Sequence, residues 1–137
     1  SVPLLNAAEC ATCSLDYEGV VTAGSMLGCA SVIVMDETAD VVKEVRRMVQ
    51  FYAHESCGQC TPCREGTAWM TRILKRIEDG RGTEEDLDTL LSLSDQMTGT
   101  TICVLSDSAA APVISSIRKF RDEYTALIRR GERVGAA

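Results

Sequence analysis

The residues best suited to chemistry in this chain are three cysteines in one short segment. Cys57, Cys60 and Cys63 recur at every third position within residues 54–66, with glycine and proline between them. Three thiolates at this spacing can turn inward from one tight loop and bind three corners of an iron–sulfur cubane. Pro62 fixes the backbone before the third cysteine and leaves nearby amides free to point at sulfides. A fourth ligand has to come from outside this loop.

The remaining cysteines are the candidates for that fourth ligand: Cys10, Cys13, Cys29 and Cys103. Cys10 and Cys13 form a C-x-x-C pair, but no histidine, second cysteine pair or thioredoxin-like βαβ pattern accompanies them. Cys29 lies between small residues, which is typical of a small buried side chain. Cys103 falls in a break between two predicted helices, where a bundle would bring it alongside the three-cysteine loop.

Zinc is the competing metal for the same thiols. A four-thiolate zinc site usually takes two cysteine pairs, whereas here three cysteines share one loop and the fourth ligand stands alone. This arrangement suits a cubane better than a tetrahedral ion, but the spacing by itself leaves zinc open. In that alternative the chain is a zinc-stapled helical interaction domain without a redox role.

The elements that must position the loop are predicted to be helices. Apolar residues recur at three- and four-residue steps in four stretches, residues 41–52, 64–78, 84–97 and 106–128. Thr83 is the predicted N-cap of the third helix, and residues 106–108 form a capping cluster for the fourth. Because the connections are short, neighbouring helices can pack antiparallel, so residues 37–130 are predicted to form a four-helix bundle.

Residues 1–36 have a different pattern. The apolar runs at residues 1–5 and 31–35 predict two strands, the second of them rich in β-branched residues. Two strands are too few to fold alone, so this segment is predicted to be the end of a small α+β domain. Residues 131–137 are predicted to be a frayed tail.

Composition excludes several classes of function. A formal net charge of −6 argues against a nucleic-acid-binding protein, and the sequence has no apolar run long enough to cross a membrane. The cysteines do not suggest a disulfide framework, so we interpret them as reduced thiols in a cytosolic or matrix-like compartment. The sequence also lacks a glycine-rich phosphate-binding loop and a Ser/His/Asp set. A cluster without a substrate site is typical of an electron relay.

Residues 55–66, Glu-Ser-Cys-Gly-Gln-Cys-Thr-Pro-Cys-Arg-Glu-Gly, resemble the flavoprotein NADH-binding subunit of respiratory complex I. The resemblance covers essentially residues 1–130, because it extends to residues 1–5, 23–28, 32–36, 101–103 and 120–122. The equivalent subunits of NAD-linked hydrogenases and formate dehydrogenases share the motif, so the parent complex stays open.

The resemblance implies a ligand set and a role. In that family the three motif cysteines and one distal cysteine bind a 4Fe–4S cluster in a C-terminal helical bundle, which implicates Cys57, Cys60, Cys63 and Cys103. The cluster takes electrons from FMN reduced by NADH and passes them through further clusters toward quinone. Residues 1–36 would be the end of a β-grasp-like domain of the soluble-ligand-binding type.

The resemblance also implies the partners. FMN and NADH would bind an N-terminal region of the same subunit, so we expect the chain to be part of an NADH:quinone oxidoreductase but not to oxidise NADH alone. Val104 and Leu105 would lie near the flavin. The other expected partners are neighbouring iron–sulfur subunits, with no nucleic acid and only indirect membrane association. The expected location is peripheral, on the cytoplasmic face of the bacterial inner membrane or the matrix face of the mitochondrial inner membrane.

Overall fold

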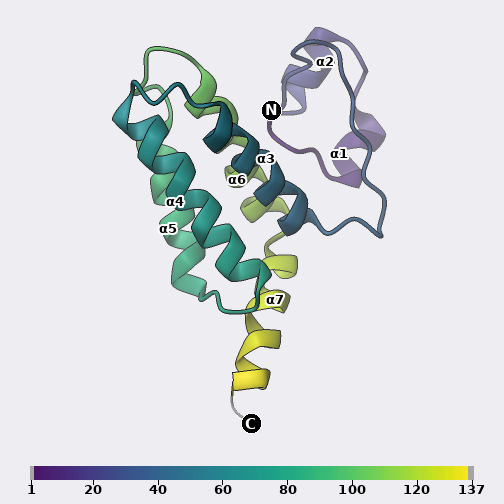
Figure 1. Cartoon of the computed structure of the whole chain (residues 1–137). Coiled ribbons are helices and arrows are strands. Elements are labelled where there is room, and N and C mark those ends of the chain that lie inside the picture. The colour runs from purple at the N-terminus through teal and green to yellow at the C-terminus, as the bar shows by residue number, and fades with distance from the viewer. Residues whose placement is uncertain (1, 136–137) are drawn as a thin grey trace.

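The computed structural model describes residues 2–135, and side chains as far as residue 131. In this part of the chain the regular elements are all helices (Figure 1). They are α1 (Ala7–Thr12), α2 (Tyr17–Thr22), α3 (Val41–Glu55), α4 (Thr61–Glu78), α5 (Glu84–Met97), α6 (Leu105–Lys119) and α7 (Arg121–Gly135). The predicted mainly-α class is therefore confirmed.

Helices α3 to α6 form a four-helix bundle. Each helix packs against the next one in the chain, and α3 closes the ring by packing against α6. The helices alternate in direction, so the α3–α4 and α5–α6 loops lie at the same end of the bundle, while the α4–α5 turn lies at the other end (Figure 1). This arrangement places the predicted cysteine-bearing loops on one side of the molecule.

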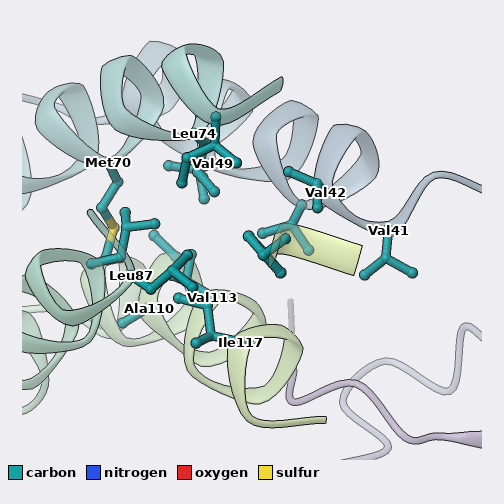
Figure 2. Close-up of a cluster of buried hydrophobic side chains, with 14 of the residues drawn as sticks. Val41, Val42, Val49, Met70, Leu74, Leu87, Ala110, Val113 and Ile117 are labelled. Atoms are coloured by element: carbon teal, nitrogen blue, oxygen red, sulfur yellow. The ribbon is translucent and has the colours of Figure 1, made fainter. Parts of the chain in front are cut away.

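The bundle is held together by aliphatic side chains that converge between the helices (Figure 2). The buried set includes Val42, Val45, Val49, Met70, Leu74, Ile77, Leu87, Leu90, Val113 and Ile117. Burying one such side chain stabilises a fold by roughly 1.5–3 kcal/mol relative to leaving it in water. The periodic apolar residues noted in the sequence are therefore the residues that fix the positions of the helices.

The start of α5 is defined by a buried carboxylate. Thr83 is the N-cap, as predicted, and its backbone N–H donates to Asp86 Oδ2 at 2.9 Å. The same carboxylate is buried and accepts a hydrogen bond from Arg76 Nε of α4 at 3.1 Å. A charged partner and a backbone donor together offset the cost of burying Asp86, so this ion pair fixes α5 against α4.

The long helix predicted after residue 106 is in fact two helices. Helix α6 ends at Lys119, its C-cap Phe120 has φ −128° and ψ 33°, and α7 begins at Arg121. Tyr124 is fully buried, and its hydroxyl lies 2.7 Å from Ser116 Oγ across the break. Apolar residues keep a helical spacing on both sides of the break, so the sequence pattern does not reveal it.

Helix α7 lies against the turn between α4 and α5 with the two backbones in contact. A Cβ atom added at Gly131 would overlap the carbonyl of Gly80 and would lie 2.9 Å from Gly80 Cα. Gly80 itself has φ +71°, in the left-handed region that glycine adopts readily. The helix continues to Gly135, so residues 131–135 of the predicted tail are helical, and residues 136 and 137 lie outside the described residues.

The strands predicted at residues 1–5 and 31–35 are not formed in the described part of the chain. Residues 31–35 are irregular, and the side chains of Ile33 and Val34 are 85% and 86% exposed. A strand needs a neighbour to satisfy its backbone N–H and C=O groups, and this segment has none in the described chain. The prediction of two strands was therefore wrong for the described chain, and the assignment of residues 1–36 to the end of an α+β domain stays a prediction.

The N-terminal segment is instead anchored to α6 by polar contacts. The Leu4 N–H donates to Ser115 Oγ at 2.9 Å, and Lys119 Nζ donates to the Leu4 carbonyl at 2.7 Å. Lys119 also pairs with Glu9 of α1 at 2.8 Å, and this hydrogen bond is the main cause that lowers the pKa of Glu9.

None of the described helices is long and apolar enough to cross a membrane.

Tyr124→Phe should change how stability depends on pH. Burial raises the pKa of Tyr124 above its ordinary value of 10.0, so the phenol stays neutral in the folded chain while it ionises in the unfolded chain. Above about pH 10 the wild type should therefore lose up to about 1.4 kcal/mol per pH unit from this residue. Urea unfolding between neutral pH and pH 11 should show a smaller alkaline loss in Tyr124→Phe than in the exposed control Tyr17→Phe, and equal losses would contradict this role.

Gly131→Ala tests the contact between α7 and the α4–α5 turn. Alanine is a better helix former than glycine by about 1 kcal/mol, so helix propensity alone predicts stabilisation. The overlap with the Gly80 backbone predicts the opposite, a loss of about 1–3 kcal/mol. Thermal or urea unfolding gives the sign of the change in the free energy of unfolding. A more stable Gly131→Ala chain would show that α7 and the α4–α5 turn do not meet at this point.

Candidate metal centre

The three-cysteine loop joins the end of α3 to the first turn of α4. Ser56 is the C-cap of α3, and Cys60 is the N-cap of α4, with Pro62 in the first turn. Cys57 is exposed and Cys60 half-buried, whereas Cys63 lies on the inner side of α4 and is only 7% exposed. The three thiols therefore lead from the surface to the edge of the core.

Gly58 makes the turn between the first two cysteines. Its φ of +79° lies in the left-handed region that other residues seldom adopt. Its N–H donates to Ser56 Oγ at 3.3 Å, and its carbonyl accepts a hydrogen bond from Arg64 Nη1 at 2.5 Å. Two side chains, one on each side of the loop, thus hold the peptide between Cys57 and Cys60.

The beginning of α4 provides a favourable environment for thiolates. Cys60 makes no side-chain hydrogen bond to the first turn, so the N–H groups at this end of the helix are not capped by a side chain. The positive end of the helix dipole stabilises negative charge at this terminus. The guanidinium of Arg64 bonds elsewhere, since its Nε donates to Glu65 Oε1 at 3.0 Å and its Nη1 donates to the Gly58 carbonyl. The backbone of Cys63 is fixed in turn, because Thr67 Oγ1 donates to its carbonyl at 2.8 Å.

Cys103 lies in the α5–α6 loop, at the same end of the bundle and exposed to solvent (Figure 1). Hydroxyl groups close this loop. Thr101 Oγ1 donates to the Cys103 carbonyl at 2.8 Å and lies 2.5 Å from Ser106 Oγ. Ser106 in turn donates to the Met97 carbonyl at 3.1 Å, so the loop is tied back to the end of α5.

The predicted capping cluster at residues 106–108 has a different role. The N-cap of α6 is Val104, which makes no side-chain cap. Asp107 instead accepts the N–H of Gly99 at 2.9 Å, and Ser106 donates to the Met97 carbonyl while its Oγ lies 2.5 Å from Thr101 Oγ1. A loop that reverses direction in a few residues leaves several backbone N–H and C=O groups without helical partners. These polar side chains bond to such groups and thereby stabilise the loop before α6.

Close packing at Gly66 links the three-cysteine loop to the loop that carries Cys103. It lies one turn after Cys63 on the buried side of α4, and a Cβ atom at this position would lie 2.8 Å from Met97 Cγ and closer still to its sulfur. Met97 is itself buried and carries the carbonyl to which Ser106 bonds. A chain of contacts therefore runs from the three-cysteine loop through Gly66 and Met97 to the loop that carries Cys103.

The structure places all four predicted ligands at one end of the bundle, but it does not assemble them into a ligation sphere. Among the described residues, no group of three or more His, Cys, Asp or Glu side chains is close enough to hold a metal ion. The donor set still fits a thiolate-bound cluster, because both loops carry free thiols and the first loop leads directly into the N-terminus of α4. The ligand set Cys57, Cys60, Cys63 and Cys103 stays a prediction.

The other cysteines lie outside the bundle. Cys10 is in α1, Cys13 is its C-cap, and Cys29 belongs to the loop after α2, where it is exposed and not buried as predicted. His54 is exposed, and its Nδ1 lies 2.8 Å from the neighbouring Glu55 carboxylate. None of these residues belongs to a group of three or more possible metal-binding side chains in the described part of the chain.

Sequence reasoning missed two residues that shape the site, Ser56 and Gly66. Ser56 precedes the first cysteine, and nothing in the sequence distinguishes it from other polar loop residues. Gly66 did carry a signal, because an isolated glycine inside a helical pattern often marks a close packing contact.

The bundle matches a known family. Residues 43–127 match the model described as the NADH-ubiquinone oxidoreductase-F iron-sulfur binding region. The match begins in α3 and ends in α7, so it contains both cysteine-bearing loops.

Whole proteins with similar sequences are the F subunits of NADH-quinone oxidoreductases. The chain is 57% identical over 117 residues to the F subunit of the Mycobacterium tuberculosis enzyme, which covers 85% of the chain and 26% of that protein. It is 44% identical over 129 residues to the F subunit of the Rickettsia bellii enzyme, covering 94% of the chain and 31% of that protein. The chain thus spans about a quarter to a third of the length of these relatives.

A solved structure has a similar fold. The structure of an NAD+-reducing [NiFe]-hydrogenase in the H2-reduced state matches with a TM-score of 0.66 and 37% sequence identity, over 69% of this chain and 16% of that chain.

Gly66→Ala should disturb the contact that relates the two loops. The new methyl group would displace the buried Met97, so we expect a loss of about 1–3 kcal/mol in the free energy of unfolding despite the better helix propensity of alanine. A double-mutant cycle with Met97→Ala isolates the contact: the cost of Gly66→Ala should largely vanish in the Met97→Ala background. An equal cost in both backgrounds would assign the effect to another cause.

Proposed function

This chain belongs to the family of NADH-ubiquinone oxidoreductase-F iron-sulfur binding regions, and on that premise we propose that it is the electron-transfer module of an NADH dehydrogenase flavoprotein subunit. In this proposal Cys57, Cys60, Cys63 and Cys103 hold one 4Fe–4S cluster. The observation that carries it is the placement of the three-cysteine loop and the Cys103 loop at one end of a bundle that matches the family over residues 43–127.

A bound 4Fe–4S cluster would supply reversible one-electron transfer, and the protein residues set the conditions for it. Four thiolates give the site a net negative charge, which the N-terminus of α4 partly offsets. The turn at Gly58, held by Ser56 and Arg64, presents the first two thiols from a fixed backbone. These residues bind and orient, and none of them is proposed as a catalytic acid or base.

The electron source and sink lie outside this chain in the proposal. Electrons would come from FMN reduced by NADH in an N-terminal region of the same subunit and leave through neighbouring iron–sulfur subunits toward quinone. The chain alone should not turn over NADH, in keeping with the absence of a glycine-rich phosphate-binding loop from its sequence. Membrane association would be indirect, at the cytoplasmic or matrix face of the inner membrane.

Residues 1–36 would be the end of the β-grasp-like domain that precedes the bundle. The exposed irregular run at residues 31–35 supports this, because Ile33 and Val34 are apolar and β-branched yet face solvent. A neighbouring strand from the preceding region would bury these side chains and satisfy the backbone. In the same proposed domain organisation, the iron–sulfur-binding bundle spans residues 37–130 and the C-terminal tail spans residues 131–137.

The equivalent subunit of an NAD-linked hydrogenase is a second candidate for the parent protein. The 0.66 TM-score with the NAD+-reducing [NiFe]-hydrogenase favours it. Sequence identity favours the complex I subunit, at 57% against 37%. Both candidates give this chain the same electron-relay role.

Metal analysis separates the proposal from a structural zinc site. The chain purified without oxygen, or reconstituted with iron and sulfide, should contain about four iron and four sulfide per chain and give a paramagnetic signal on reduction. Stoichiometric zinc without sulfide would instead support the zinc-stapled interaction domain.

Two cysteine variants test the fourth ligand. Cys103→Ala should lose most of the bound iron and sulfide of a four-iron cluster, because one corner of the cubane then lacks its thiolate. Cys10→Ala is the matched control, since it removes another exposed thiol that lies outside the bundle. A full cluster in Cys103→Ala, or a lost cluster in Cys10→Ala, would show that the ligand assignment is wrong.

A further inference from the structure

Ser56 places a hydroxyl group beside the innermost cysteine. Its Oγ lies 3.4 Å from Cys63 Sγ, within hydrogen-bonding reach of a sulfur atom. Ser56 is partly buried and Cys63 is buried, so this contact lies on the protein side of the loop.

The hydroxyl is held in place from two sides. The backbone N–H of Ser56 donates to the Tyr52 carbonyl at 3.0 Å as the C-cap of α3. Its Oγ accepts the N–H of Gly58 at 3.3 Å. Such a hydroxyl is less free to rotate toward water than that of an exposed loop serine.

The direction of the Ser56–Cys63 hydrogen bond follows from protonation. A hydroxyl has one hydrogen and two lone pairs, and one lone pair of Ser56 Oγ already accepts from Gly58. A thiol can donate or accept, but a metal-bound thiolate carries no hydrogen and can only accept. When Cys63 is a cluster ligand, the Ser56 O–H is therefore the donor.

We propose that the Ser56 hydroxyl donates a hydrogen bond to the Cys63 thiolate and thereby raises the reduction potential of the cluster, an inference that rests on the proposed function. Reduction adds negative charge to the cluster and its sulfurs, so a donor to a ligand sulfur stabilises the reduced state more than the oxidised state. Ser56 is in this sense a positioning and tuning residue, because it acts through Cys63.

Because Cys63 is buried, a hydrogen bond from Ser56 to its sulfur should affect the reduction potential more than a hydrogen bond from a water molecule would. Cys57 and Cys103 are exposed, so water can donate to their sulfurs. Cys63 is buried, and a hydrogen bond in this less polar surrounding is electrostatically stronger than one in water. Removal of the hydroxyl leaves this sulfur with fewer donors and with little access for replacement water.

A redox titration of three variants tests the inference. The midpoint potential of the reconstituted cluster is measured by electron paramagnetic resonance in wild type, Ser56→Ala and Ser56→Thr. Ser56→Ala should have a lower potential, with a shift of several-fold to about tenfold in the reduced-to-oxidised ratio, where tenfold equals about 59 mV for one electron. Ser56→Thr keeps a hydroxyl and should stay close to wild type.

Thr61→Ala is the matched control, because it removes an exposed hydroxyl at the first residue of α4 that makes no hydrogen bond to a cysteine sulfur in the described structure. Its potential should equal that of wild type. A loaded Ser56→Ala cluster with wild-type potential would overturn the inference while leaving the proposed function intact. Failure of the wild type to load iron and sulfide would instead overturn the proposed function.

A second measurement applies if Ser56→Ala does not retain its cluster. Electron–nuclear double resonance on the reduced wild type in H2O and D2O detects exchangeable protons coupled to the cluster. The inference requires such a proton in the wild type and in Ser56→Thr. Its absence from the wild type would overturn the inference without the alanine variant.

Discussion

The alternating direction of α3 to α6 is the constraint on which the site depends. Because each helix reverses the one before it, the α3–α4 and α5–α6 loops must meet at one end of the bundle. Cysteines that are far apart in the sequence thereby share one surface. The apolar residues in the interior contribute to function only indirectly. They fix the arrangement of the four helices, and that arrangement brings the two cysteine-bearing loops together.

Close packing then converts a shared end into a defined site. The α4 backbone at Gly66 lies against Met97, and Met97 supplies the carbonyl that Ser106 binds. On the other side, Ser56 and Arg64 hold the turn at Gly58. Polar side chains and two glycines, together with the first turn of α4 that carries Cys63, therefore determine where the thiols lie. Loops of this kind can adjust when a ligand binds, which suits a site whose ligands converge around a cluster.

Most of the bundle could be predicted from the sequence, because its helices are amphipathic and bounded by recognisable signals such as Thr83. The break at Phe120 could not, since the apolar spacing continues across it and the corner is defined by contacts such as that between Ser116 and Tyr124. The strand predicted at residues 31–35 failed for a different reason. Its composition is suited to a sheet, but the pairing partner that would make it a strand is not supplied by the described chain. For the metal centre, spacing identified the loop of Cys57, Cys60 and Cys63, whereas the choice of Cys103 needed the family resemblance.

In the proposed function both cysteine-bearing loops close on one cluster. Hydrogen exchange of the chain, measured by mass spectrometry before and after anaerobic reconstitution with iron and sulfide, tests this closure. We expect peptides covering residues 56–64 and residues 99–105 to gain protection together, while the α4–α5 turn at the opposite end does not change. Protection of residues 56–64 alone would show that the cluster is held without the loop that carries Cys103.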